Sequence, residues 1–448
     1  MPDVVTDIEK LYPAHVERYR KLYEDVLSSC NSDGMEGFVI SSGTVKTAFL
    51  DDHPYPFKTN PHFKSWLPVI DNDQSFLVIK PGQRPLLLFH QPRDYWHQSP
   101  DDPQGFWVDQ FEIRTVAMLD DALTAMGNTA SLIFIGEEND LAQAWGFGQI
   151  NPEHILNAVH YERAYKTDYE IACLQLANDQ AVRGHRAAES AFRTHQSEFD
   201  IQHAYLGTIR HREHQTPYSS IVALNEHCAV LHYQHYDLSP PPEIHSMLID
   251  AGANYNGYAA DVTRTYAFKD DEFQALIDSL DEQQRALVGD ISIGVSYVEL
   301  HRQMHLRLAN LLREFRFVDM TPESMVELGL TFTFLPHGLG HFLGLQTHDV
   351  GGHQATPGGH QQPPPEAWPA LRLTRPIEDR QVFTIEPGLY FIPMLLNELK
   401  QSEHASSVNW PRVEEFIPYG GIRIEDNVAI IDESPFNLTR HAFETLGP

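Results

Sequence analysis

Short apolar runs bounded by turn residues alternate with helix-like sequence through the first 160 residues. Segments 37–42, 75–80, 84–89 and 131–136 are rich in Val, Ile, Leu and Phe and short enough to be buried strands. The Pro-Gly-Gln-Arg sequence at 81–84 predicts a hairpin turn between two of them. The pattern therefore predicts an α/β unit at residues 1–160.

A second unit is expected from about residue 161. Thr167 and Glu170 form a capping-box pattern, which predicts the start of a helix, and residues 171–192 keep helical spacing of apolar positions. No Gly/Ser-rich linker separates the two units, so we expect them to pack firmly against each other.

The remaining sequence alternates predicted strands with helices, so the chain as a whole is expected to be α/β (α+β). Its predicted domains are an N-terminal α/β domain, 1–160, and a second domain, 161–448. The predicted strands of the second domain are 247–252, 257–268, 382–391 and 422–431, and one predicted helix is 298–315.

Composition narrows the possible partners. The 448 residues carry a net charge of −30, which argues against nucleic-acid and anionic-membrane partners because both select basic surfaces. Hydrophobic residues make up 42% of the chain, enough for sizeable cores.

Cysteine usage and hydropathy indicate a cytoplasmic protein. Cys30, Cys173 and Cys228 are an odd, widely spaced set without a CxxC pair, which is typical of a reducing compartment. The N-terminal sequence MPDVVTDIEKLY lacks the apolar region of a signal peptide, and no apolar run approaches the roughly 20 residues of a membrane span.

Five polar residues in the second domain stand in distinctive contexts. Asp250 ends LID, Asp261 lies in AADVTRTY, His341 follows PHGLG, Glu386 lies in TIEPGLY and Glu425 in GGIRIEDN. Four carboxylates and an imidazole exceed the needs of one zinc ion but suit two hard divalent ions, since carboxylates can bridge. Carboxylates within apolar strands are costly unless they are paired or bind metal.

Strand alternation supports this set independently. Arg423 and Glu425 share one face of their predicted strand, whereas Ile422 and Ile424 share the other. Asp261 is expected on the same face as Thr263, Thr265 and Ala259. The glycines before His341 predict a loop there, and the absence of HExxH argues against a thermolysin-like zinc site.

In these motifs the chain resembles the pita-bread metallopeptidases, and most closely the bacterial Xaa-Pro dipeptidases (prolidases), which include organophosphorus acid anhydrolases. The segments FLDDHPYPFKTNPHFKSWLP and IVALNEHCAVLHY extend the resemblance over nearly the whole chain. The resemblance implies a curved sheet that carries two divalent ions, with manganese favoured and cobalt or zinc as alternatives.

The resemblance also implies roles for the motif residues. Asp261 and Glu425 would bridge the ions, Asp250 would complete one site, and His341 with Glu386 the other. A metal-bridging hydroxide would be the nucleophile, and Glu386 its general base. His337 and His348 would be catalytic donors to the oxyanion or to the substrate.

Substrate residues follow from the same resemblance. Arg372 and His232 would bind the free carboxylate of an Xaa-Pro dipeptide, and Tyr218 would line its pocket. Arg423 either lines the pocket or, more simply, orients a bridging carboxylate. Asp52 either reaches over from a second subunit, which implies a homodimer, or belongs to an ordinary turn.

Several alternatives stay open from the sequence. An aminopeptidase P that takes longer peptides is the nearest, and Arg372 with the DDHPYPF segment favours the dipeptidase. A non-catalytic binding protein of this fold is disfavoured because all five metal-ligand positions are kept. A hydroxide nucleophile can attack phosphorus as well as carbon, so hydrolysis of organophosphorus esters and fluorides is an expected side activity. The Pro/Gly/Gln-rich segment 351–370 is either a surface loop or a lid.

Overall fold

The computed structural model describes residues 8–30, 34–212 and 214–447. The first seven residues, on which the expectation about a signal peptide partly rests, lie outside this range. Within the described residues, no helix has both the length and the apolar character needed to cross a bilayer.

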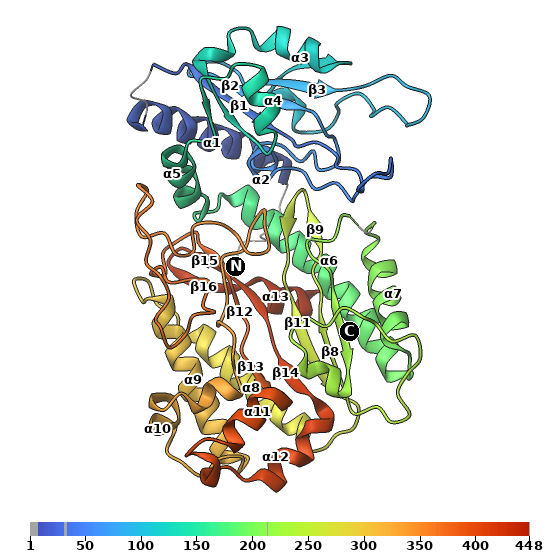
Figure 1. The fold of residues 1–448 in the computed structure, drawn as a ribbon, viewed down its shortest axis with the longest axis vertical. Coiled ribbons are helices and arrows are strands. Elements are labelled where there is room, and N and C mark those ends of the chain that lie inside the picture. Colours follow the sequence, from blue (N-terminus) through green and yellow to red (C-terminus); the bar gives the residue numbers. More distant parts are fainter. Residues whose placement is uncertain (1–7, 31–33, 213, 448) are drawn as a thin grey trace.

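The N-terminal domain is built on one sheet with the strand order β4-β3-β2-β1-β5-β6 (Figure 1). β1 pairs parallel with β5 and antiparallel with β2, and β2 and β3 form the hairpin expected from the turn at 81–84. The strands are β1 (Gly37–Ser41), β2 (Phe76–Ile79), β3 (Leu86–His90), β4 (Glu112–Val116), β5 (Leu132–Ile135) and β6 (Gln149–Ile150).

Helices cover both faces of this sheet, which explains why its central strands are apolar at successive positions. Phe38 and Ile40 of β1 face the core under α1, while Val39 faces the core under α3 and α4. The helices are α1 (Ile8–Cys30), α2 (Pro61–Lys64), α3 (Leu119–Met126), α4 (Asn139–Ala144) and α5 (Glu153–Arg163).

The second domain begins with α6 (Asp168–Arg193), and the predicted capping box is present. Glu170 N–H donates to Thr167 Oγ1 over 3.3 Å, and Thr167 N–H donates to Glu170 Oε2 over 2.8 Å. The other helices are α7 (Glu198–Ile209), α8 (Glu272–Gly289), α9 (Tyr297–Glu314), α10 (Pro322–Glu327), α11 (Pro393–Lys400), α12 (Trp410–Phe416) and α13 (Leu438–Thr445).

Several short sheets form the centre of this domain, with α6 and α7 on one side and α8 and α9 on the other (Figure 1). Their orders are β11-β8-β7, β12-β15-β16, β13-β14 and β10-β9. The strands are β7 (Ile221–Leu224), β8 (Ser246–Asp250), β9 (Asn254–Tyr255), β10 (Tyr258–Ala259), β11 (Thr263–Ala267), β12 (Val382–Ile385), β13 (Gly388–Tyr390), β14 (Gly421–Arg423), β15 (Asp426–Ile431) and β16 (Ser434–Asn437).

The two domains share a core, which confirms the expectation of firm packing. Tyr12 of α1, Tyr169 of α6 and Leu343 of the second domain belong to one buried apolar cluster. A buried ionic group adds to this interface. Asp349 accepts from Arg163 Nη2 over 2.6 Å and from Lys166 Nζ over 2.9 Å, and all three side chains are at most 2% exposed.

Candidate metal centre

The predicted metal ligands lie where strands end or are interrupted. Asp250 is the last residue of β8, Asp261 lies between β10 and β11, Glu386 between β12 and β13, and Glu425 between β14 and β15. His341 lies in a loop, as its flanking glycines predicted. The continuous strands expected at 257–268, 382–391 and 422–431 are therefore wrong at their centres.

Specific hydrogen bonds stabilise these interruptions. The backbone N–H of Asp261 donates to Asn427 Oδ1 over 3.0 Å, and that of Glu425 donates to the Thr263 carbonyl over 3.0 Å. The N–H of His341 donates to Thr384 Oγ1 over 3.1 Å. Alternating sequence does not reveal such breaks, because the partners that satisfy the backbone lie elsewhere in the chain.

The breaks bring the predicted ligands together. Ligand atoms of Asp261, His341 and Glu425 all lie within 4.8 Å of one another, and all three residues are buried. His341 Nε2 lies 3.4 Å from Asp261 Oδ2 and 3.4 Å from Glu386 Oε1. Its Nδ1 donates to the Phe342 carbonyl over 2.9 Å, which leaves Nε2 as the ligand atom.

The carboxylates carry more negative charge than the protein compensates. Burial, reinforced by the neighbouring carboxylates, raises the pKa of Glu425 well above its usual value and that of Glu386 to about 7. Burial also raises the pKa of Asp250 although Arg423 opposes this. Burial lowers the pKa of His341, but Asp261 and Glu386 outweigh it and raise the pKa overall.

The balance of charge in the inner cavity indicates whether these residues suit metal ions. Apart from Arg423 and the histidines, the residues that line the inner cavity supply one further cation, Arg372, to face four carboxylates. Buried carboxylates without sufficient countercharge are costly, and two hard divalent ions with oxygen and imidazole ligands would supply the missing charge. The described residues therefore fit the metal group that the sequence predicted.

Arg423 lines the inner cavity, and its guanidinium is engaged by protein groups. Its Nη2 pairs with Asp250 Oδ2 over 2.8 Å, and its Nη1 donates to Tyr390 OH over 3.1 Å. Tyr390 in turn lies 2.8 Å from His337 Nε2. Arg423 thus pairs with Asp250, not with either of the carboxylates expected to bridge, and its role in substrate binding stays a prediction.

His337 has both ring nitrogens engaged. Nδ1 lies 2.8 Å from the Gly338 carbonyl, which only accepts, so Nδ1 carries the proton and Nε2 accepts from Tyr390 OH. Burial, together with Arg423, lowers the pKa of His337 to about 3. In this arrangement the imidazole is neutral, and its single N–H donates to the Gly338 carbonyl. Donation to a substrate would therefore require the ring to turn.

His348, His232 and Arg372 are free to contact a ligand. All three line an inner cavity of about 310 Å³ together with the five predicted ligands. No hydrogen bond or ion pair engages the side chain of His348 or Arg372 within the described part of the chain. Burial and His341 lower the pKa of His348 to about 4, so its imidazole is neutral.

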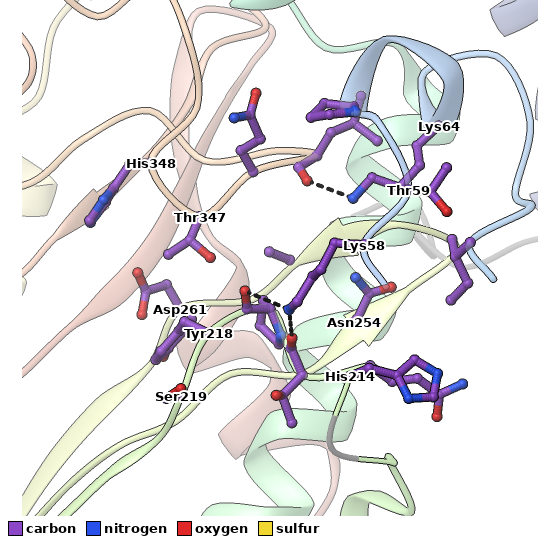
Figure 2. Close-up of a pocket in the computed structure, with 18 of the residues that line it drawn as sticks. Lys58, Thr59, Lys64, His214, Tyr218, Ser219, Asn254, Asp261, Thr347 and His348 are labelled. Carbon is purple, nitrogen blue, oxygen red and sulfur yellow. Dashed lines mark hydrogen bonds between the residues drawn. The ribbon is translucent and has the colours of Figure 1, made fainter. Parts of the chain in front are cut away.

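Tyr218 lies beside the inner cavity in a larger cleft of about 670 Å³ (Figure 2). Its hydroxyl donates to Asp250 Oδ1 over 2.8 Å, and burial raises its pKa well above the usual value. Asp52 is not among the residues that line either space. Asp51 Oδ1 accepts from the backbone N–H of Asp52 over 2.7 Å and of His53 over 3.2 Å, as in an ordinary Asx turn.

Glu198, His227 and Asp237 form a second cluster with ligand-like spacing. The Glu198 carboxylate already accepts four hydrogen bonds. The donors are Leu224 N–H, His227 Nδ1–H, Tyr233 OH and Asp237 N–H. This carboxylate anchors a loop and has no remaining need of a cation.

Sequence reasoning missed three supporting residues of the centre. Tyr390 links Arg423 to His337, Thr263 donates to Glu425 Oε2 over 2.8 Å, and Thr384 donates to Glu386 Oε1 over 3.2 Å. Thr263 had been placed on the face of Asp261 without a role. The alternation around Glu386 would have placed Thr384 beside it, whereas nothing local marks Tyr390.

The segment 351–370 is anchored to the body of the protein. Gln354 Nε2 donates to the Asn157 carbonyl of α5 over 2.7 Å, and Trp368 stacks on His305 of α9 with ring centroids 5.8 Å apart. These contacts hold the segment beside the cavity that Ala370 and Arg372 line.

Comparison with known proteins places this fold and site in a family. Residues 10–161 match the model of the Xaa-Pro dipeptidase N-terminal domain, and residues 172–432 match that of metallopeptidase family M24. Proteins named Xaa-Pro dipeptidase from Pseudoalteromonas translucida and Pseudoalteromonas haloplanktis are 48% and 49% identical to the chain over 436 residues. These matches cover 97% of this chain and 99% of each relative.

A solved structure supports the fold. Zinc-substituted aminopeptidase P of E. coli in complex with product has a TM-score of 0.72 at 22% identity, and the match covers 96% of this chain and 95% of that one. This confirms the predicted architecture, an N-terminal α/β domain followed by a pita-bread domain. The chain belongs to metallopeptidase family M24 and carries the N-terminal domain of the Xaa-Pro dipeptidases.

Proposed function

We propose that the protein is an Xaa-Pro dipeptidase that hydrolyses dipeptides with C-terminal proline and uses two divalent ions, preferably manganese. The observation that carries the proposal is the arrangement around the inner cavity. Five predicted ligand groups, three of them buried and two half-buried, line one part of it, while the unpaired Arg372 and the exposed His232 line the same space. The names of the full-length relatives support the same activity.

The chemistry divides between the ions and the side chains. Bound divalent ions supply Lewis-acid polarisation and lower the pKa of a water molecule. Asp250, Asp261, His341, Glu386 and Glu425 would hold them. Glu386 lines the cavity beside the other ligands, so it would also take a proton from the nucleophile and return it to the leaving group.

His348 and Arg372 would bind the substrate. His348 is neutral and unpartnered, so an N–H of its ring can donate to the oxygen on which charge develops. A planar guanidinium binds a carboxylate through two hydrogen bonds, which suits Arg372 to the free carboxylate of the proline, with His232 beside it. Recognition of that carboxylate would restrict cleavage to dipeptides.

Hydrolysis of Leu-Pro tests the proposal. Chelator-stripped protein should be inactive, added Mn²⁺ should restore cleavage, and Ala-Pro-Ala should stay intact. Arg372→Gln should raise KM for Leu-Pro with a smaller effect on kcat, because it removes a contact to the substrate rather than a ligand of the ions. Cleavage of the tripeptide would instead assign the protein as an aminopeptidase P, and inactivity on both peptides would contradict the proposal.

Hydrolysis of organophosphorus esters and fluorides is proposed as a side activity. The same ions and nucleophile can act on phosphorus. A fluoride-release assay with a phosphorofluoridate should show activity that depends on Mn²⁺ and disappears together with Leu-Pro hydrolysis in Asp261→Asn. Retention of fluoride release in that variant would place the side reaction at another site.

We also propose that the active form is a homodimer. The loop that carries Asp52 exposes several large apolar side chains, because Phe49 is 89% exposed, Leu50 91% and Tyr55 58%. Exposed apolar groups of this density mark a surface that contacts a partner. Asp52 would then complete the cleft of the second subunit.

Sedimentation equilibrium checks the dimer. The wild-type protein should have twice the chain mass, and Leu50→Ser should shift it toward the monomer and reduce Leu-Pro hydrolysis in parallel. Met118→Ser, which changes an apolar residue that is 64% exposed outside this loop, is the matched control and should change neither. A fully active wild-type monomer would contradict the proposal.

A further inference from the structure

We propose that Lys58 of the N-terminal domain is a positioning residue for Tyr218 in the second domain and, through Tyr218, for Asp250. The consequence for catalysis rests on the proposed two-metal function, whereas the contacts themselves do not. Lys58 precedes α2 and is separated from Tyr218 by most of the N-terminal domain and by α6 and α7.

Lys58 fastens the backbone that leads into Tyr218. Its Nζ donates to the Thr216 carbonyl and, over 3.3 Å, to the Pro217 carbonyl, the two peptide groups that precede Tyr218 (Figure 2). A lysine whose purpose is solubility extends its ammonium into water. Lys58 instead turns its ammonium onto two consecutive carbonyls of the other domain.

Other contacts confine Tyr218 as well. The turn after Asp250 packs so closely that a Cβ on Gly252 would lie 2.9 Å from a ring carbon of Tyr218 and 3.0 Å from Pro217 Cγ. The Tyr218 hydroxyl donates to Asp250 Oδ1 over 2.8 Å, while Arg423 holds Asp250 Oδ2. The two hydrogen bonds from Lys58 add to these contacts, so their loss would free the segment to move away from Asp250.

Lys58 is exposed as a residue, but its ammonium is partly desolvated and has no carboxylate partner in the described part of the chain. It forms no ion pair within the described residues, and burial lowers its pKa. The nearby acid Glu137 pairs with Lys46 over 2.8 Å. The partially desolvated ammonium is therefore satisfied mainly by the two carbonyls, and its position is defined by the backbone that it holds.

A direct contact between Lys58 and the substrate is the competing explanation, since Lys58 also lines the 670 Å³ cleft. The two explanations differ in how Lys58 depends on Tyr218. A positioning residue loses its effect once the Tyr218 hydroxyl is gone, whereas a substrate contact keeps its effect.

A double-mutant cycle with Lys58→Met and Tyr218→Phe separates them. Partners that orient a metal-ligating carboxylate typically contribute about tenfold or more to metal affinity or activity. We therefore expect each single variant to lose about tenfold in kcat/KM for Leu-Pro and in Mn²⁺ affinity measured by calorimetry, and the double variant to lose no more than Tyr218→Phe alone. Lys58→Arg keeps the charge and the donors and should restore most of the loss.

Lys64 supplies the matched control. It belongs to the same N-terminal segment and lines the same cleft, but its Nζ donates to the Leu345 carbonyl over 3.1 Å, on the segment that leads to His348. Whatever its own effect, Lys64→Met should be independent of Tyr218→Phe, and the two losses should multiply. Thermal unfolding of every variant shows whether any loss reflects global destabilisation.

Multiplicative losses for Lys58→Met and Tyr218→Phe, in hydrolysis and in Mn²⁺ binding, would overturn the proposal. A rise in KM alone that persists in the Tyr218→Phe background would assign Lys58 to the substrate instead. If the wild-type protein hydrolyses no Xaa-Pro dipeptide, the Mn²⁺ cycle still measures the coupling. Failure of the proposed function and failure of this inference are therefore distinguishable.

Discussion

At the residue scale, the metal centre is defined by carboxylates that the protein does not neutralise by itself. Burial raises the pKa values of Asp250, Glu386 and Glu425, and Asp250 is the one among them that has an arginine partner. In such a site a carboxylate without a sufficient countercharge destabilises the metal-free fold and becomes favourable when a cation binds.

Asp261→Asn should therefore separate activity from stability. It removes a carboxylate proposed to bridge the two ions, so Mn²⁺-dependent Leu-Pro hydrolysis should fall below detection. Without metal, the variant should be more stable than wild type by about 1–2 kcal/mol in the free energy of unfolding, because one like charge has left the cluster. It should therefore unfold at a higher denaturant concentration. Urea titrations in chelator measure this difference.

A control for that comparison is Glu299→Gln on α9. Glu299 pairs with Arg302 over 2.8 Å on the exposed surface, so its loss should change stability by less than about 0.5 kcal/mol. Near-normal turnover by metal-stripped Asp261→Asn would contradict the two-metal mechanism altogether.

Sequence patterns predicted the candidate ligand residues, three of which the structure brings together, but not how they are supported. Asp261 and Glu425 stand in motifs whose composition signals metal binding, and these motifs lie next to one another in the fold. The hydrogen bond from Tyr390 to His337 and that from Lys58 to the Pro217 carbonyl join residues far apart in the chain. Such contacts leave no local periodicity, so they become visible only in three dimensions.

At the element scale, the connection between α5 and α6 holds the segment that carries His348. Arg163 ends α5, Lys166 precedes α6, and both cations hold Asp349, the residue next to His348. The sequence predicted the start of α6 from its capping box, because that signal is local. It did not predict the ionic group, because the charged partners are separated by 183 residues or more.

Asp349→Asn should destabilise the fold strongly. The change leaves two buried cations without their shared partner, and removing one member of a buried ion pair typically costs about 3–5 kcal/mol. The midpoint of urea denaturation should fall accordingly. His348, the next residue along the chain, should be less well positioned, so the folded fraction of the variant should have a lower kcat. A loss below about 1 kcal/mol would show that the cations find other partners.

At the scale of the whole molecule, buried neutral histidines make stability depend on pH. Burial lowers the pKa of His185 and of His337 to about 3, and that of His160 and of His305 to about 4. Below about pH 6.5 the unfolded chain binds protons at these residues and the folded chain does not, so stability is lost as the pH falls.

His185→Gln should reduce this dependence. His185 donates to the Ala251 carbonyl over 2.9 Å, and the glutamine amide retains a donor without an ionisable ring. Between about pH 7 and pH 5, the variant should lose about 2 kcal/mol less stability than wild type. Denaturation in chelator across this range measures the slope. The exposed His154 provides the control, since His154→Gln should leave the slope unchanged.

The interruption of the strands at the predicted ligands has a consequence for how this fold can evolve. The backbone at Asp261, Glu386 and Glu425 is held by partners other than the ligand side chains, so these side chains are not needed for the sheets to assemble. A lineage can therefore exchange them without losing the fold. The fold and its cavity would remain while the side chains in the cavity change, so the same fold could come to bind other molecules.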